Sequence, residues 1–226
     1  MTTENQPSAD RFLPVLLILF AGSGCSALIY EIVWYQLLQL VIGSTAMALG
    51  ILLAIFMGGL CIGSLALPRL RASGQHPLRL YAWLEVGIAA CGLLVLAAIP
   101  VLSSTLAPIL MLAPTILMGA SLPAIAGWVE ATPRGVSWWS LLYGGNTVGA
   151  VFGCLFAGFW LLRVYDTAVA TYAAVAINLI VAAVSFWLAA QTPARAGLGA
   201  AQEAVPATNE RASRCPARGR SERPPG

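Results

Sequence analysis

The chain has 226 residues, of which 59% are hydrophobic and only 9% are charged. Soluble domains carry about 25% charged residues and need a polar exterior, so this composition excludes an ordinary soluble fold. The net charge is only +3, and all twelve basic residues are arginine. The apolar residues form long blocks, which is typical of helices that cross a lipid bilayer.

Cysteine and histidine are placed in a way that disfavours metal centres and disulfide frameworks. The chain has no C-x-x-C pair, and its one histidine, His76, is expected in a loop. We therefore predict no metal site and no cofactor, and we interpret the cysteines of the apolar blocks as small buried hydrophobes. No nucleic-acid partner is expected.

Six segments are apolar over roughly 20 residues or more, the length that crosses the hydrocarbon core. In chain order they cover about residues 12–41, 46–67, 80–102, 106–129, 138–162 and 167–190. The second is expected to end at Pro68, and the three prolines of the fourth are expected to kink it rather than break it.

The domain organisation follows from these segments. Residues 12–190 are predicted to form an all-α, polytopic membrane bundle of six transmembrane helices. Residues 1–11 precede it as a short N-terminal tail. Residues 191–226 are rich in Ala, Arg, Pro, Ser and Glu and are predicted to be disordered, because they have too few large apolar residues to build a core.

Arginine is distributed unequally between the two sides of the predicted membrane domain. With six spans, both termini and the second and fourth loops share one side, which holds every arginine except Arg163. Positively charged residues gather on the cytoplasmic side of membrane proteins. The sequence therefore predicts that both termini are cytoplasmic.

Four polar residues lie inside the predicted spans, where exposure to lipid is costly. Glu31, Glu85, Asn146 and Asn178 each share a helix face with small residues at spacings of three, four or seven. Small residues mark close helix contacts, so we expect these four side chains to face other helices or a wet interior. They are the candidates for a substrate or proton pathway, with a structural anchor or an inter-helix hydrogen bond as the alternative.

The two glutamates are predicted to lie near opposite membrane faces. Glu31 is about 19 residues, or about 28 Å, into its span, whereas Glu85 is about five residues into a span that runs the same way. We therefore expect no direct pair between the two carboxyl groups. Arg163, the one basic residue of the outer side, is a candidate partner for Glu31.

Glycines at a spacing of four predict two close helix contacts. Gly145, Gly149 and Gly153 form an unbroken run on the fifth span, and Gly59 and Gly63 form a shorter one on the second. Tight helix packing is the favoured interpretation of both runs.

Four segments resemble the membrane region of bacterial membrane-fused spermidine synthase-like proteins, in the same order along the chain. Residues 27–34 read A-L-I-Y-E-I-V-W, residues 80–87 read L-Y-A-W-L-E-V-G, residues 118–123 read M-G-A-S-L-P and residues 142–151 read L-Y-G-G-N-T-V-G-A-V. The similarity extends over about residues 17–190. That membrane region is similar to one half of a major facilitator-type transporter, so the resemblance implies a half-major-facilitator-like bundle in the bacterial inner membrane.

In many members of that family a soluble aminopropyltransferase domain follows, which binds decarboxylated S-adenosylmethionine and a polyamine. The segment after Gln191 has neither a glycine-rich loop nor an acidic constellation, so the resemblance does not include that domain. The family also usually carries Arg shortly after the Trp of the first segment, where Gln36 stands here. We predict that this chain alone is not an enzyme.

Three interpretations of function follow. The leading one is a transporter-like or anchoring membrane module, which as a half-transporter would have to form a homodimer. The second is the membrane subunit of a polyamine aminopropyltransferase whose catalytic domain is a separate synthase-like chain. The third is a truncated remnant, which the Arg- and Pro-rich tail suggests.

Overall fold

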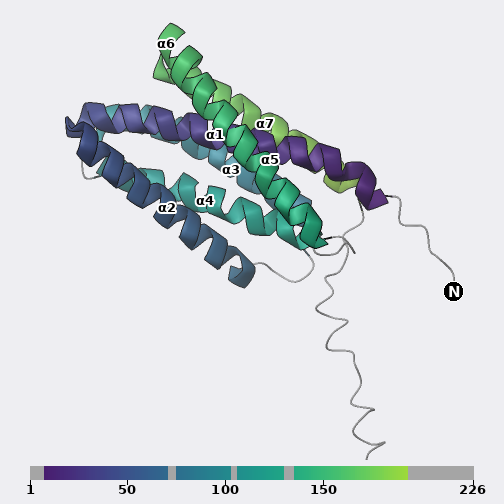
Figure 1. Cartoon of the computed structure of the whole chain (residues 1–226). Helices are drawn as coiled ribbons and strands as arrows, with labels where there is room; N and C mark the ends of the chain where they lie inside the picture. Colours follow the sequence, from purple (N-terminus) through teal and green to yellow (C-terminus); the bar gives the residue numbers. More distant parts are fainter. Residues whose placement is uncertain (1–7, 71–74, 103–105, 130–134, 193–226) are drawn as a thin grey trace, which may run out of the picture.

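The computed structural model describes residues 8–70, 75–102, 106–129 and 135–192, and this part of the chain is all-α (Figure 1). All six long helices are long and apolar enough to cross a membrane, which confirms the predicted six-span bundle. Most of the two predicted tails, 1–11 and 191–226, lies outside the described residues. The long helices are α1 (Ser8–Ile42), α2 (Thr45–Leu70), α3 (Pro77–Ala98), α4 (Leu106–Val129), α5 (Gly135–Phe156) and α7 (Thr167–Gln191).

Several helix ends differ from the prediction: α1 begins at Ser8, inside the predicted N-terminal tail, and α5 begins at Gly135. α2 continues past Pro68, and the Arg69 side chain donates to the Leu65 carbonyl oxygen (2.9 Å), which satisfies a carbonyl group near the helix end. α3 begins earlier than predicted, at Pro77, because proline suits the first helical position, where its missing N–H leaves no bond unmade. α4 is continuous through its internal prolines, as predicted.

Short elements complete the spans. A 3-10 turn, η1 (Ile99–Val101), follows α3, and α5 passes into a π-helical turn, η2 (Ala157–Leu161), and then into the short α6 (Leu162–Val164). Between α1 and α2, Gly43 adopts a φ of 75°, which L side chains rarely allow, and its N–H donates to the Gln39 carbonyl oxygen (2.9 Å). This turn reverses the direction of the chain.

The six long helices pack in a pattern that repeats between the two halves of the bundle. α1 packs mainly on α5 and α7, α4 packs mainly on α2 and α3, and α3 also packs on α7. Exchanging α1 with α4, α2 with α5 and α3 with α7 turns the α1–α5 contact into the α4–α2 contact and the α1–α7 contact into the α4–α3 contact, and leaves the α3–α7 contact unchanged. The first three spans and the last three therefore occupy equivalent places.

The two equivalent units have opposite orientations. α2 reverses the direction of α1 at the Gly43 turn, and α4 runs parallel to α2, because Gly59 and Gly63 of α2 meet successive turns of α4. α1 and its equivalent α4 consequently run in opposite directions. Two units related in this way form an inverted-topology repeat.

Glycines line the two equivalent contacts, α1 with α5 and α2 with α4. A Cβ atom at Gly149 or Gly153 of α5 would overlap the backbone of α1, and a Cβ at Gly59 or Gly63 of α2 would overlap α4. Gly145 differs, because a Cβ there would lie at an ordinary distance of 3.5 Å from α1. Four of the five glycines that were predicted to pack therefore lie where an added methyl group would clash.

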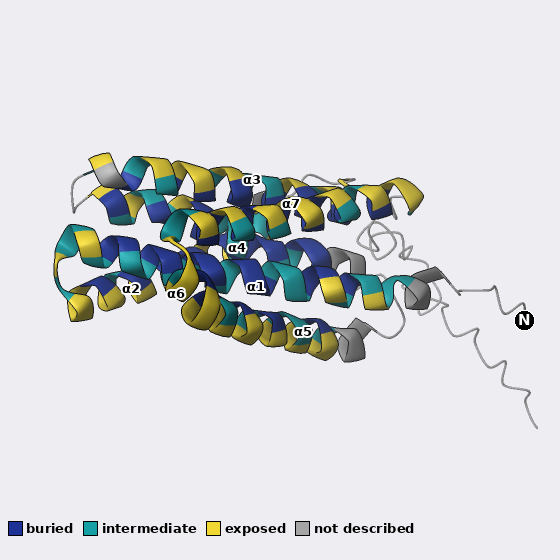
Figure 2. Cartoon of the chain, turned by 90° about the horizontal axis from the view of Figure 1, so that it is seen from above, coloured by how far each residue is buried: buried dark blue, intermediate teal, exposed yellow. Residues whose placement is uncertain are grey.

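α2 and α5 are the outer helices of the bundle. In the apolar 18-residue stretch of each span, only 28% and 22% of the residues of α2 and α5 are buried, against 39–44% in the other four spans, so these two helices expose the most surface (Figure 2). The exposed side chains are largely apolar, as for Leu53 on α2 and Phe152 on α5. Such surfaces are compatible with lipid tails, which are as apolar as leucine.

Candidate functional site

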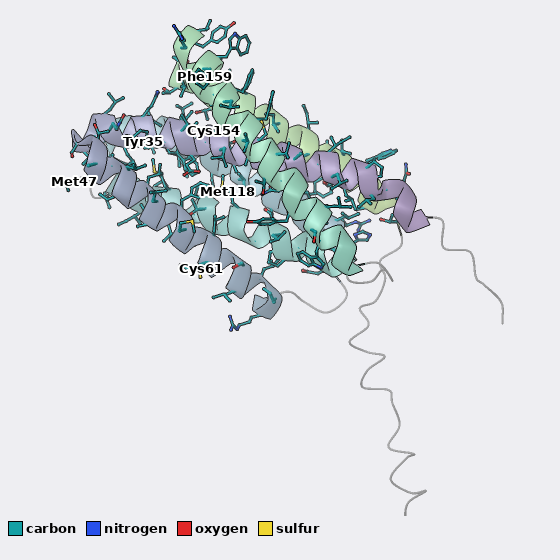
Figure 3. The ribbon with its side chains drawn as sticks, viewed as in Figure 1. Tyr35, Met47, Cys61, Met118, Cys154 and Phe159 are labelled. Atoms are coloured by element: carbon teal, nitrogen blue, oxygen red, sulfur yellow. The ribbon has the colours of Figure 1, made fainter. Side chains whose placement is uncertain are left out.

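A pocket of about 440 Å³ lies between α1, α2, α4 and α5. Its walls are mainly aromatic rings and Met and Leu side chains; Figure 3 labels Met118 of α4 and Cys61 of α2, which both line it. No charged residue lies among the described residues of the wall. A mainly apolar pocket with a few polar groups is typical of a small-molecule site. The polar wall residues are Ser23, Ser64, Ser121, Tyr143 and Asn146.

Asn146 is the one predicted pathway residue that lines the pocket. It is half-buried on α5, and its side-chain oxygen would lie 2.7 Å from a Cβ atom at Gly24. The missing side chain of Gly24 therefore provides the space in which the amide lies against α1. Asn146 was predicted to share a helix face with small residues, and in the structure its amide lies at the pocket wall.

Glu85 lies directly behind the wall and is fully buried. The Ser23 hydroxyl, which lines the pocket, donates to Glu85 Oε1 at 2.7 Å. Tyr81 precedes Glu85 by one turn of α3, and its hydroxyl lies beside both groups without completing a hydrogen bond to either. Phe20, another wall residue, contacts the Tyr81 ring at a centroid distance of 6.1 Å. The carboxyl group is thus one hydrogen bond away from the pocket.

α7 contributes two more polar side chains to the same interior. The rings of Trp83 on α3 and Phe186 on α7 are in contact, with a centroid distance of 5.4 Å. Since α7 runs antiparallel to α3, Ser185 lies near the level of Glu85, and Asn178 lies two helix turns from Ser185 toward the C-terminal end of α3. Ser185 and Asn178 are both fully buried. Neither amide atom of Asn178 nor the Ser185 hydroxyl has a hydrogen-bond partner.

Tyr30 of α1 extends this polar interior toward the other end of the bundle. Its ring packs on α3 where a Cβ atom at Gly92 would come within 2.5 Å of it, and its hydroxyl also lacks a partner. Seven buried side-chain N or O atoms of the described residues lack a partner, and six of them lie between α1, α3 and α7. Buried polar groups in proteins normally pair with protein, water or an ion. The interior between these three helices is therefore a polar seam within an apolar bundle.

Glu31 and Glu85 do not pair, as predicted, but they lie closer together along the bundle than the sequence predicted. The Ser23–Glu85 bond sets their levels, so Glu31 lies eight residues, or about 12 Å, further along the bundle. One reason is that α3 begins earlier than predicted, at Pro77, which moves Glu85 deeper into its span.

Glu31 is half-buried, one turn beyond Ala27 and Leu28 of the pocket wall. It forms no hydrogen bond or ion pair with any residue of the described ranges. The predicted partner Arg163 is exposed and does not pair with it. Glu31 therefore does not line the pocket, and no contact that it makes with the described residues supports a role there.

Several residues of the site were not singled out from the sequence. Tyr81 carries a detectable signal, because it stands one turn before Glu85 on the same helix face. Ser23 carries none, because the carboxyl group that it contacts is 62 positions away along the chain. Wall residues such as Ser121 likewise depend on how α2, α4 and α5 surround the pocket.

The lone histidine joins two helix ends. His76 Nε2 lies 3.0 Å from the Thr192 carbonyl oxygen, which connects the start of α3 to the end of α7. Within the ranges that the structure describes, no three His, Cys, Asp or Glu residues are grouped as metal ligands.

No protein-family model, no curated protein and no solved structure matches the chain.

Proposed function

We propose that this chain is a non-catalytic, transporter-like membrane module that binds a small solute in the pocket between α1, α2, α4 and α5. The observation that carries the proposal is the position of the pocket in the repeat. It is lined by α1 and its equivalent α4, and by α2 and its equivalent α5. Transporters with inverted repeats bind their substrates where the repeats meet, near the middle of the membrane.

The resemblance to membrane-fused spermidine synthase-like proteins supports the same proposal. Residues 27–34, 118–123 and 142–151 all contribute to the pocket wall, and residues 80–87 include the carboxyl group of Glu85 behind it. The segments that carry the resemblance therefore gather around one site. A half-major-facilitator-like module of this kind makes polyamines the first solutes to test.

Reconstituted vesicles test the proposal. The purified full-length chain in proteoliposomes should accumulate labelled spermidine faster than protein-free vesicles. Ser64→Phe places a ring in the pocket and should abolish the uptake, because Ser64 is a half-buried wall residue. Ser140→Phe is the matched control, because Ser140 is exposed and lies outside the pocket, and it should transport normally. Equal uptake by the two variants would contradict a role for the pocket.

A second copy of the chain is the proposed partner of a half-transporter. α2 and α5 flank the pocket and expose apolar surface, which a second copy could cover to enclose the solute. Native mass spectrometry from lipid nanodiscs should then show a dimer, and a monomer that still transports would contradict this arrangement.

The membrane subunit of a separate polyamine aminopropyltransferase is the alternative function. If vesicles show no flux while a chain with spermidine synthase activity co-purifies with this protein from its native membranes, the subunit interpretation replaces transport. If neither is found, both functional proposals fail and the remnant interpretation stands.

The proposed location is the bacterial inner membrane with both termini in the cytoplasm, which the asymmetric placement of arginine supports. A C-terminal fusion to green fluorescent protein should fluoresce, and a fusion to alkaline phosphatase at the same position should be inactive. The reverse pair of results would contradict the orientation.

A further inference from the structure

The carboxyl group of Glu85 has an environment that does not suit a lone negative charge. It is fully buried, it accepts one hydrogen bond from Ser23 at Oε1, and its Oε2 has no partner. An ionised carboxylate in an apolar interior is costly unless it is paired with a cation or fully hydrogen-bonded. Adding a proton to Oε2 removes the charge and turns the unpartnered atom into a donor.

Among the residues that the structure describes, no basic side chain pairs with this carboxyl group. α4 and α7, which both pack on α3, contain no Asp, Glu, His, Lys or Arg in their described residues. The titratable groups that face Glu85 are the phenols of Tyr81 on α3 and Tyr30 on α1. Arg79 precedes Glu85 by six residues and is exposed, and Arg11 lies about 18 Å from Ser23 along α1.

The pocket in front of Glu85 suits an organic cation. Its wall includes the rings of Phe20, Phe56 and Tyr143, which attract cations through their faces, and hydroxyl groups that can accept hydrogen bonds. An anion would find no positive charge among the described wall residues. The carboxyl group that contacts the wall is that of Glu85, which accepts a hydrogen bond from the wall residue Ser23.

We propose that Glu85 carries a proton when the pocket is empty and releases it when an organic cation enters the pocket, with Ser23 as the connecting hydroxyl. In the release, the O–H bond at Oε2 breaks, its electron pair stays on the carboxylate, and water accepts the proton. The cation takes over the neutralisation of the charge. This inference rests on the proposed function, because it assigns the class of solute and the coupling ion of the same pocket.

The distance through Ser23 sets the size of the effect. A cation in contact with the Ser23 hydroxyl lies roughly 6 Å from the carboxylate, given the 2.7 Å hydrogen bond and one further contact. At an effective dielectric constant of about 20, two unit charges at that distance change a proton equilibrium by about 100-fold. Occupancy of the pocket should therefore suffice to change the protonation state of Glu85.

Infrared difference spectroscopy tests the inference on the full chain in lipid. At neutral pH the empty protein should show the C=O stretching band of a protonated carboxyl group, and tetramethylammonium chloride should remove it, with release of about one proton per chain to a pH-sensitive dye. Sodium chloride at equal ionic strength should leave the band in place. No band in the empty protein, or a band that the organic cation does not change, would overturn the inference.

Two variants assign the band and test the link. Glu31→Gln leaves Glu85 as the sole glutamate in the described spans and should keep the band, so the assignment does not depend on whether Glu85→Gln folds. Ser23→Ala should keep the band in the empty protein but require at least about 10-fold more tetramethylammonium to remove it. A response equal to that of the wild type would exclude Ser23 as the link.

The outcomes separate this inference from transport itself. A band that responds to the cation, without spermidine flux in vesicles, would refute the transport proposal and leave cation-linked proton release in place. Flux without a protonated carboxyl group in the empty protein would refute the inference alone.

Discussion

The contact between α1 and α5 allows a sharp prediction, because three glycines of α5 differ in what surrounds them. A Cβ atom at Gly149 would lie 2.6–2.7 Å from backbone atoms of Ala21 and still closer to its carbonyl oxygen. A Cβ at Gly145 would lie 3.5 Å from a Leu17 side chain, and one at Gly144 would meet nothing within 4 Å. Alanine substitution at the three positions therefore adds the same methyl group to one helix in three different surroundings.

The magnitude follows from the backbone contact at Gly149. Carbon atoms pack best at about 3.5–4.0 Å, so Gly149→Ala must push α1 and α5 apart by about 1 Å. A gap of that size removes about a quarter to a half of the dispersion energy of each contact. Alanine favours the helical state by up to about 1 kcal/mol over glycine, which offsets part of the loss. We expect Gly149→Ala to lower the free energy of unfolding by about 1–3 kcal/mol.

The assay is reversible unfolding by sodium dodecyl sulfate in mixed micelles, followed by circular dichroism. Gly144→Ala should leave the free energy of unfolding unchanged or raise it by up to about 1 kcal/mol, and Gly145→Ala should fall between the other two variants. If Gly149→Ala is as stable as Gly144→Ala, the close approach of α5 to the α1 backbone is refuted.

Three further predictions follow from the helix contacts, the start of α7 and the pocket wall. Gly63→Ala on α2 should lower the free energy of unfolding much as Gly149→Ala does, whereas Gly58→Ala should not, because a Cβ at Gly58 meets nothing within 4 Å. If Gly63→Ala and Gly58→Ala have equal free energies of unfolding, the equivalence of the α2–α4 and α1–α5 contacts is contradicted. Asp166→Ala should cost about 1 kcal/mol, because the Asp166 carboxylate accepts a hydrogen bond from a backbone N–H of α7 at 2.8 Å, and Asp166→Ser should recover most of this loss. A membrane-permeant maleimide should modify exposed Cys61 faster than buried Cys25 by peptide mass spectrometry, with spermidine slowing the reaction of Cys61 only.

The glycine runs illustrate how far sequence reasoning reaches. Spacing alone predicted that Gly145, Gly149 and Gly153 share a face that packs tightly, because a period of four aligns residues on one side of a helix. The structure separates Gly145 from the other two, because the helices cross and only part of the face touches the α1 backbone. Crossing geometry depends on both helices, so the sequence of one helix could not reveal it.

The polar residues show the same division. Their rarity in apolar spans was enough to select Glu85 and Asn146, since a buried polar group must find a partner or water. It was not enough to predict that Glu85 meets Ser23 of another span, or that Asn146 lies at a pocket while Glu31 stays unpaired. Those outcomes depend on the register between α1 and α3 and on the early start of α3 at Pro77.

The sequence by itself determined the number of spans and the all-α class, because the length of an apolar stretch decides whether one helix can cross a bilayer, whatever its neighbours do. Only the tertiary structure decided which helices are equivalent, where the pocket lies and which polar groups come together. In a bilayer these choices depend on shape and on hydrogen bonds between helices that are far apart in the chain, because lipid tails offer apolar side chains as good a surrounding as another helix does.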